Sequence, residues 1–230
     1  MRRRPFLAAL AAATLLAAGC GGGAEDAPAK PPAERLAAAR TALEKAGSLT
    51  LDLTSTDVPA TQNGVSAAKG QGVVDAAEPK FKGTITGTVR GVAATVDVIA
   101  VGKDAYLKLF TPDFEKFDLS TLNAPNPATF FDPAAGIAGL LPKTASPTTG
   151  GQVRAGKEVL TQISGTLPAQ EVSDLFHLGD GTGTYKVTFA LTEADQLRTA
   201  TLVGPFFEGT TSTYTLTLTD YGSPVEITRP

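Results

Sequence analysis

Alternation of apolar and polar residues is the feature that most constrains how this chain can fold. Leu49, Leu51 and Leu53 alternate with threonine and aspartate, and the segment 81–90 places lysine, threonine and arginine between apolar residues in the same way. A period of two buries one face of an extended segment and leaves the other in water, which is typical of antiparallel sheets. The segment 92–101 is apolar on both faces, so we expect it to be central in the sheet. Further strands are predicted at residues 105–110, 159–167, 184–191, 197–203 and 213–219.

Three segments depart from this alternation and predict helices, at residues 33–46, 132–142 and 168–176. The first is rich in strong helix formers and stops at Gly47. The second opens with Asp132 and Pro133, an N-cap residue and a proline at the first helical position. Its remaining side chains are almost all apolar. Because a helix without a polar face must be covered or must face something apolar, we expect it against the sheet.

The N-terminus indicates an exported, lipid-anchored protein. A basic start, Met1 to Arg4, precedes the apolar run Phe6 to Ala18, which is shorter than the about 20 residues that a membrane-spanning helix needs. The run ends in small residues directly before Cys20, which resembles a bacterial lipobox, where the cysteine is acylated and the signal is cut just before it. An ordinary secretory signal with an incidental Cys20 is the alternative. An unpaired cysteine in an exported protein favours acylation, and two or three acyl chains make a stable anchor.

The sequence therefore divides into a lipoprotein signal peptide (1–19), an acylated cysteine with a flexible tether (20–32) and one domain (33–230). Glycine and proline dominate the tether, and nothing in it can form a core. We expect the protein to be anchored by lipid in the cell membrane, with its domain on the extracytoplasmic face.

Composition excludes several function classes. One Cys and one His exclude disulfide frameworks and Cys/His metal sites. A net charge of −3 and the lack of Trp argue against nucleic-acid binding, since no basic stripe can neutralise phosphates. We expect no metal and no cofactor.

The catalytic signals are weak. Ser66 and Lys69 have the spacing of penicillin-interacting enzymes, but they lie in a predicted hairpin rather than at a helix start, and we interpret the match as chance. The glycine-rich run 179–183 leads into a strand, so we interpret it as a turn rather than a phosphate loop. His177 follows a short helix and has no obvious partner, which favours a capping or surface role. We predict no catalytic residue and no enzyme.

The order of these features resembles the LppX/LprA/LprF/LprG family of actinobacterial lipoproteins. The resemblance rests on the lipobox at Cys20, the helix running into residues 48–53, the strand 105–109, the Asp-Pro-x-x-Gly-Ile motif at 132–137 and the Ser-Gly-Thr-x-Pro motif within 159–168. The sequence departs from the family pattern at Gln162, at Ile163 and in the run Thr148 to Gly151.

The resemblance implies an α+β fold, an open antiparallel half β-barrel with helices packed on its concave face around an apolar cavity. It implies a cell-envelope lipoprotein that binds acyl chains of lipids or glycolipids and carries them between the plasma membrane and the outer envelope. A membrane lipid exporter is the partner of some members, and we expect a monomer. The alternative is a structural or signalling surface lipoprotein with a solid core and a protein partner. An enzyme would require a carboxylate site that the sequence does not reveal.

The expected cavity lining comes from both helices and sheet. Gly83 and Gly87 fall on the apolar face of their strand, and we expect them to leave space rather than fill it. The same lining residues could instead form an ordinary packed core, because both use the same side chains. The predicted lining residues are Ile85, Val89, Val96 and Val98 from the sheet, with Phe130, Phe131, Ile137, Leu140, Leu141, Val172 and Phe176 from the helical segments.

Overall fold

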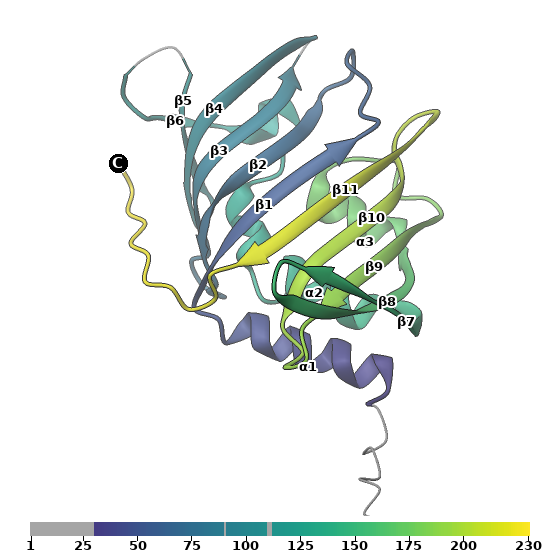
Figure 1. Ribbon diagram of the computed structural model, residues 1–230. Coiled ribbons are helices and arrows are strands. Elements are labelled where there is room, and N and C mark those ends of the chain that lie inside the picture. Colours follow the sequence, from purple (N-terminus) through teal and green to yellow (C-terminus); the bar gives the residue numbers. More distant parts are fainter. Residues whose placement is uncertain (1–29, 90, 110–111) are drawn as a thin grey trace, which may run out of the picture.

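One large antiparallel sheet forms most of the protein (Figure 1). The computed structural model describes residues 30–89, 91–109 and 112–230; the predicted signal peptide and Cys20 lie outside the described residues. The eleven strands are β1 (Ser48–Thr56), β2 (Gly64–Val73), β3 (Lys80–Val89), β4 (Val92–Val101), β5 (Asp104–Lys108), β6 (Glu115–Phe117), β7 (Ala145–Ala155), β8 (Glu158–Pro168), β9 (Thr184–Leu191), β10 (Leu197–Phe207) and β11 (Thr210–Thr219).

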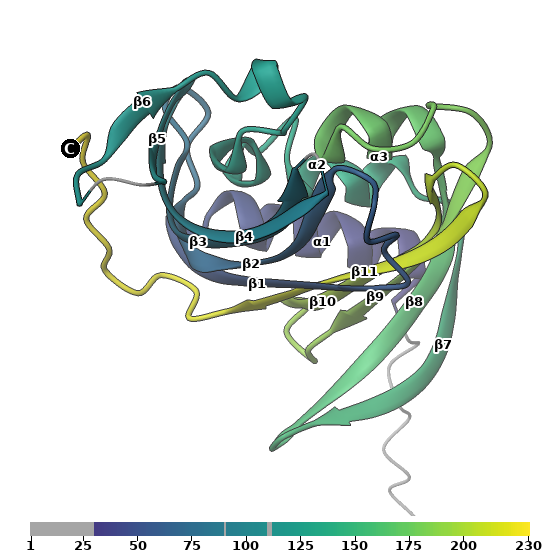
Figure 2. The same ribbon diagram turned by 90° about the horizontal axis from the view of Figure 1, so that it is seen from above.

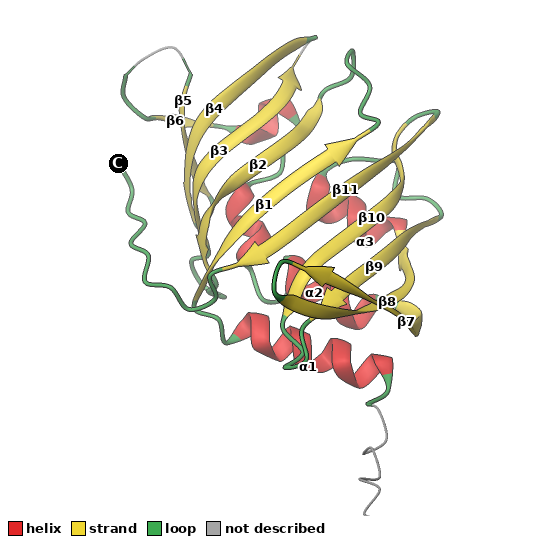
Figure 3. Cartoon of the chain, viewed as in Figure 1, coloured by secondary structure: helices red, strands yellow, loops and turns green. Residues whose placement is uncertain are grey.

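Within the described residues, six short or medium helical elements accompany the sheet, and Figure 3 shows helices in red. The α-helices are α1 (Pro32–Glu44), α2 (Ile137–Leu140) and α3 (Ala169–Phe176), and the 3-10 helices are η1 (Leu119–Leu122), η2 (Pro127–Phe131) and η3 (Leu141–Lys143). None of the described helices is long and apolar enough to cross a membrane.

The sheet is an open half-barrel whose helices lie on the concave face (Figure 2). Its strand order is β6-β5-β4-β3-β2-β1-β11-β10-β9-β8-β7, so β6 and β7 are the two edges and do not pair with each other. The first and last strands meet at the centre, where Leu51 pairs with Leu218 and Leu53 with Leu216. The predicted α+β half-barrel is confirmed.

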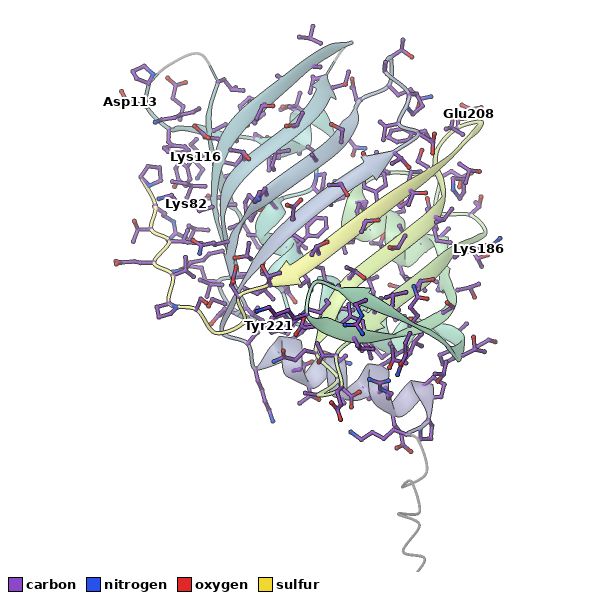
Figure 4. The ribbon with its side chains drawn as sticks, viewed as in Figure 1. Lys82, Asp113, Lys116, Lys186, Glu208 and Tyr221 are labelled. Carbon is purple, nitrogen blue, oxygen red and sulfur yellow. The ribbon has the colours of Figure 1, made fainter. Side chains whose placement is uncertain are left out.

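Alternation decides which residues face the helices. Leu49, Leu51 and Leu53 are buried on the concave side, while polar side chains such as Lys82 and Lys186 point outward from the convex face (Figure 4). One-sided burial of this kind is why the period of two identified these strands.

Strand β4 lies third from the β6 edge, so the expectation that it is central was wrong. The C-terminal half of β4 is nevertheless covered on both faces. Val98 and Ala100 pack into the main core, whereas Ile99 and Val101 pack outward against Ile227 of the C-terminal segment. The apolar residues on both faces of β4 are therefore explained by the C-terminal segment, which packs on the outer face, and not by a central position in the sheet.

That C-terminal segment, residues 220–230, runs along the outer side of the sheet (yellow in Figure 1). Beyond Ile227, the Arg229 guanidinium lies 2.7 Å from a carboxylate oxygen of Glu78 and 3.5 Å from one of Asp104. Exposed ion pairs of this kind each contribute little stability, so burial of Ile227 is the main attachment.

Helix α1 lies across one end of the sheet and is fixed there by a buried carboxylate. The Arg35 Nε donates to Asp195 Oδ1 at 2.5 Å, the Lys30 ammonium donates to Asp195 Oδ2 at 2.9 Å, and Arg35 also donates to the Thr192 carbonyl at 2.8 Å. Asp195 sits in the β9–β10 turn, and its side chain is only 4% exposed. The start of the domain is thereby tied to a turn far along the chain.

The helix expected over residues 132–142 is shorter than predicted. Asp132 does not start it: its side chain closes a turn by accepting from the backbone N–H groups of Ala134 and Ala135, and α2 begins only after Gly136. Because Pro142 cannot donate a backbone hydrogen bond, the helix continues only as the single turn η3. The helices predicted at 33–46 and 168–176 are confirmed as α1 and α3.

Candidate functional site

An apolar cavity lies between the concave face of the sheet and the helical layer. Its volume is about 40 Å³, and its walls come from β1, β2, β3 and β11 on one side and from η2, α3 and adjoining turns on the other. The lining residues are Leu51, Leu53, Val65, Ala68, Phe81, Ile85, Pro125, Pro127, Phe130, Phe176, Leu178 and Tyr214. The Tyr214 hydroxyl is satisfied, since it donates to the Val65 carbonyl at 2.7 Å.

A smaller cavity of about 10 Å³ lies beside it, towards α1. Phe130 lines both cavities. The second cavity is lined by Leu43, Leu49, Val74, Phe130, Phe131, Asp132, Pro133, Ile137 and Ala138. A chain-shaped ligand could run from one cavity to the other if Phe130 moved.

Capped turns position the helical layer over the sheet. The side chain of Asn126 accepts from the N–H two residues on at 3.0 Å, and its amide donates to the Gly102 carbonyl at 3.0 Å. Asp132 caps the next turn in the same way. Phe130 and Phe131 lie between these two caps and are held facing the sheet, with the Phe131 ring stacked 6.0 Å from that of Phe81.

An aromatic cluster closes the cavity at the α3 side. The Phe176 ring lies 5.3 Å from Phe130, 5.5 Å from Phe206 and 5.4 Å from Tyr214, all in edge-on geometry. Tyr185 meets Phe206 at 4.6 Å. Burial raises the pKa of Tyr185 to about 12 and shifts the pKa of Tyr214 upward too, so both phenols stay neutral near pH 7. Tyr214, which lines the cavity, therefore adds no charge to its wall.

The structure brings together some of the predicted lining residues. Ile85, Phe130 and Phe176 line the main cavity, and Phe131 and Ile137 line the smaller one with Phe130. The others lie elsewhere. Val98, Leu140, Leu141 and Val172 are buried in the core outside both cavity walls, Val96 is half-buried beside it, and Val89 is exposed.

Several lining residues were not predicted from sequence. The alternation identifies Leu51 and Leu53 as inward-facing, but it does not indicate that they line a cavity. Val65 and Ala68 lie in β2, a segment whose sequence indicates only part of a hairpin.

Ser66 and Lys69 lie in β2 as well, which contradicts a Ser-x-x-Lys helix start. His177 caps α3 with its N–H on the Ser173 carbonyl, as expected for a capping residue.

The inner-face glycines do not leave space, and this expectation was wrong. A Cβ at Gly83 would lie 2.1 Å from the Lys69 carbonyl oxygen and 2.6 Å from the Cα of Gly70, its partner across the strands. At Gly87 it would lie 2.7 Å from the Gly64 carbonyl oxygen. These glycines allow neighbouring strands to approach closely where the sheet curls.

Comparison with known proteins supports the fold. Residues 31–227 match the family model LppX_LprAFG, described as a lipoprotein family. LprF from Mycobacterium bovis is similar over 86% of this chain and 96% of its own, with a TM-score of 0.74 and 16% identity. The Mycobacterium tuberculosis lipoprotein LppX is similar over 85% of this chain and 97% of its own, with a TM-score of 0.63 and 17% identity. No curated protein sequence matches significantly.

Proposed function

This chain belongs to the LppX_LprAFG lipoprotein family, and from that premise we propose that it binds acyl chains of lipids or glycolipids between its sheet and its helical layer. We further propose that it carries them through the cell envelope without chemical change, anchored by an acylated Cys20, and that a membrane lipid exporter is a possible class of partner. The observation that carries the proposal is the uncharged, apolar cavity on the concave face.

The energetics favour a shielded site for such a cargo. Exposing a sixteen-carbon chain to water costs about 13 kcal/mol at about 0.8 kcal/mol per methylene, so a lipid crosses an aqueous space very slowly without cover. An apolar wall without charges supplies that cover and requires no catalyst. Few polar groups in the wall also mean little selection among headgroups.

Loading requires the helical layer to move. The main cavity of about 40 Å³ has room for only a few water molecules at about 10–15 Å³ each, and a sixteen-carbon chain is far larger. The sheet is held by continuous ladders of hydrogen bonds. The layer from η1 to η3 consists of turns and helices of at most five residues, which makes it the part that opens at lower cost.

A solid-core lipoprotein that binds a protein partner is the second candidate, because the small cavity volume fits it equally well. Mass spectrometry of an organic extract separates the two. The mature chain, residues 20–230 with Cys20→Ala, is purified from a lipid-rich actinobacterial host and extracted. Stoichiometric lipid supports the carrier, and an extract without lipid supports the solid core.

Tryptophan substitutions at two positions test where the acyl chain lies. Ile85 lines the main cavity and is half-buried, so Ile85→Trp is expected to fill the cavity and to lower lipid uptake at least about tenfold, or about 1.4 kcal/mol. Val98 is 2% exposed and outside both cavity walls. Val98→Trp is therefore expected to cost about 1–3 kcal/mol or more in unfolding free energy. Uptake of a fluorescent diacyl lipid and urea unfolding measure both effects; equal uptake by Ile85→Trp and the parent would place the chain elsewhere.

Replacement of Cys20 tests the anchor. In the full chain with its signal, Cys20→Ala is expected to move the protein from the membrane fraction to the soluble fraction or to leave the precursor uncut, because the acylated cysteine would be lost. Metabolic labelling with an alkyne fatty acid and fractionation measure the change. Normal cleavage with an unchanged membrane fraction would show that Cys20 is not the anchor.

A further inference from the structure

The concave face of the sheet continues past the cavity as an uncovered apolar rim. Along β3 and β4, inward-facing residues are buried towards the α1 end of the sheet, half-buried at Ile85 and Val96, and exposed beyond them, and Leu109 directly follows the end of β5. The exposed fractions are 38% at Val89, 67% at Val92 and 44% at Leu109. These are three of the five large hydrophobic side chains that are exposed in the described part of the chain.

Strand register makes this rim continuous with the cavity. Val89 pairs with Val92, and Ile85, which lines the main cavity, pairs with Val96 on the same face. Ala94 lies between the two pairs, opposite Gly87. An acyl chain could therefore pass from the rim to the cavity over apolar side chains alone.

The rim lies at the end of the sheet opposite α1 (Figure 1). The end of β3 and the start of β4 lie near the top of that view, and α1 lies at the bottom. Cys20 and the rim are different parts of the sequence, so replacing Cys20 by alanine removes the proposed anchor and leaves the rim in place.

The chemistry of the rim favours hydrocarbon over a protein partner. Interfaces between proteins are enriched in Trp, Tyr, Met and Arg, which carry most of their binding energy. The described rim residues are Val89, Val92, Ala94 and Leu109, all aliphatic and uncharged. Aliphatic side chains beside an apolar cavity suit insertion into the acyl region of a bilayer.

We propose that this rim inserts into the surface of a lipid bilayer and that acyl chains pass across it to and from the cavity. The inference rests on the proposed lipid-carrier function.

The chain has no Trp, so a single introduced Trp reports its own position. Val92→Trp is placed in the mature chain with Cys20→Ala, and Val159→Trp is the matched control, since Val159 is 44% exposed but lies in the β7–β8 hairpin. With phosphatidylcholine vesicles, Val92→Trp is expected to emit at shorter wavelength and to be quenched several-fold more strongly by brominated lipid than Val159→Trp. Equal quenching of both variants, or a shift of Val92→Trp that rises with protein concentration without vesicles, would overturn the proposal; the latter would indicate a second copy on the rim.

Transfer kinetics separate this inference from the carrier function. Val92→Asp is expected to slow transfer between donor and acceptor vesicles at least about tenfold while lipid still co-purifies with the protein, and Val159→Asp is expected to change neither. Slow transfer with retained lipid supports the rim. Unchanged transfer by Val92→Asp with bound lipid overturns the rim but leaves the carrier standing, and absence of lipid from the parent chain overturns the carrier itself.

Discussion

Replacing Asp195 by asparagine is expected to lower the free energy of unfolding by about 3 kcal/mol at neutral pH, which thermal or urea unfolding measures. The side chain of Asp195 is 4% exposed and that of its partner Arg35 is 13% exposed, so the variant would leave a largely buried guanidinium without its carboxylate. Lys30, at 64% exposure, can turn to water and loses little. Asparagine keeps the size of the side chain and tolerates the left-handed backbone at this position, where φ is 58°. The loss therefore reports the charge rather than the shape.

The same carboxylate makes stability depend on pH in a defined direction. Burial opposes its ionisation, but hydrogen bonds from Lys30 and Arg35 outweigh that effect and hold the pKa of Asp195 below its ordinary value of 3.8. A carboxyl whose pKa is lower in the folded state contributes its full stability above the unfolded pKa and loses it as the pH falls through the folded pKa. The difference between parent and Asp195→Asn should thus be constant near neutrality and shrink below about pH 4.

Glu34→Gln is the matched control, because Glu34 is an exposed acid in the first turn of α1, where loss of its charge is expected to cost less than about 0.5 kcal/mol. If Asp195→Asn were as stable as Glu34→Gln at neutral pH, the tie between α1 and the β9–β10 turn would contribute nothing.

Sequence patterns predicted the strands that are buried on one side and missed those that are not. β7 is exposed along almost its whole length, so no apolar period marks it. β2 is missed for a different reason: glycines occupy inward positions where apolar side chains would be expected. The Phe131 ring fills that place above Gly72, where a Cβ would lie 2.2 Å from the ring. The apolar group is thus supplied by a residue far along the chain.

The sequence predicts an apolar cavity on the concave face, but it does not predict which residues line that cavity. Inward-facing apolar residues could be named from the period, but a residue lines a cavity only where the opposite layer leaves it uncovered. Ile85 and Val98 lie on the same concave face of adjacent strands, yet only Ile85 lines the cavity. The difference depends on how the turns around Asn126 and Asp132 place Phe130 and Phe131, and local propensity does not encode that contact.

Gly83→Ala is expected to destabilise the fold by about 3 kcal/mol or more, because its Cβ would lie 2.1 Å from the Lys69 carbonyl oxygen and the neighbouring backbone cannot turn aside as a side chain can. Replacing glycine by alanine also restricts the unfolded chain, which stabilises by about 0.4–1 kcal/mol and is too small to offset the clash. Gly151→Ala in β7 isolates that smaller effect, since a Cβ there meets nothing within 4 Å. The urea midpoint of Gly83→Ala should therefore be lower than that of the parent chain, and the midpoint of Gly151→Ala should be equal or higher. If Gly83→Ala behaved like Gly151→Ala, the close approach of β2 and β3 that curls the sheet over the cavity would not be a requirement of the fold.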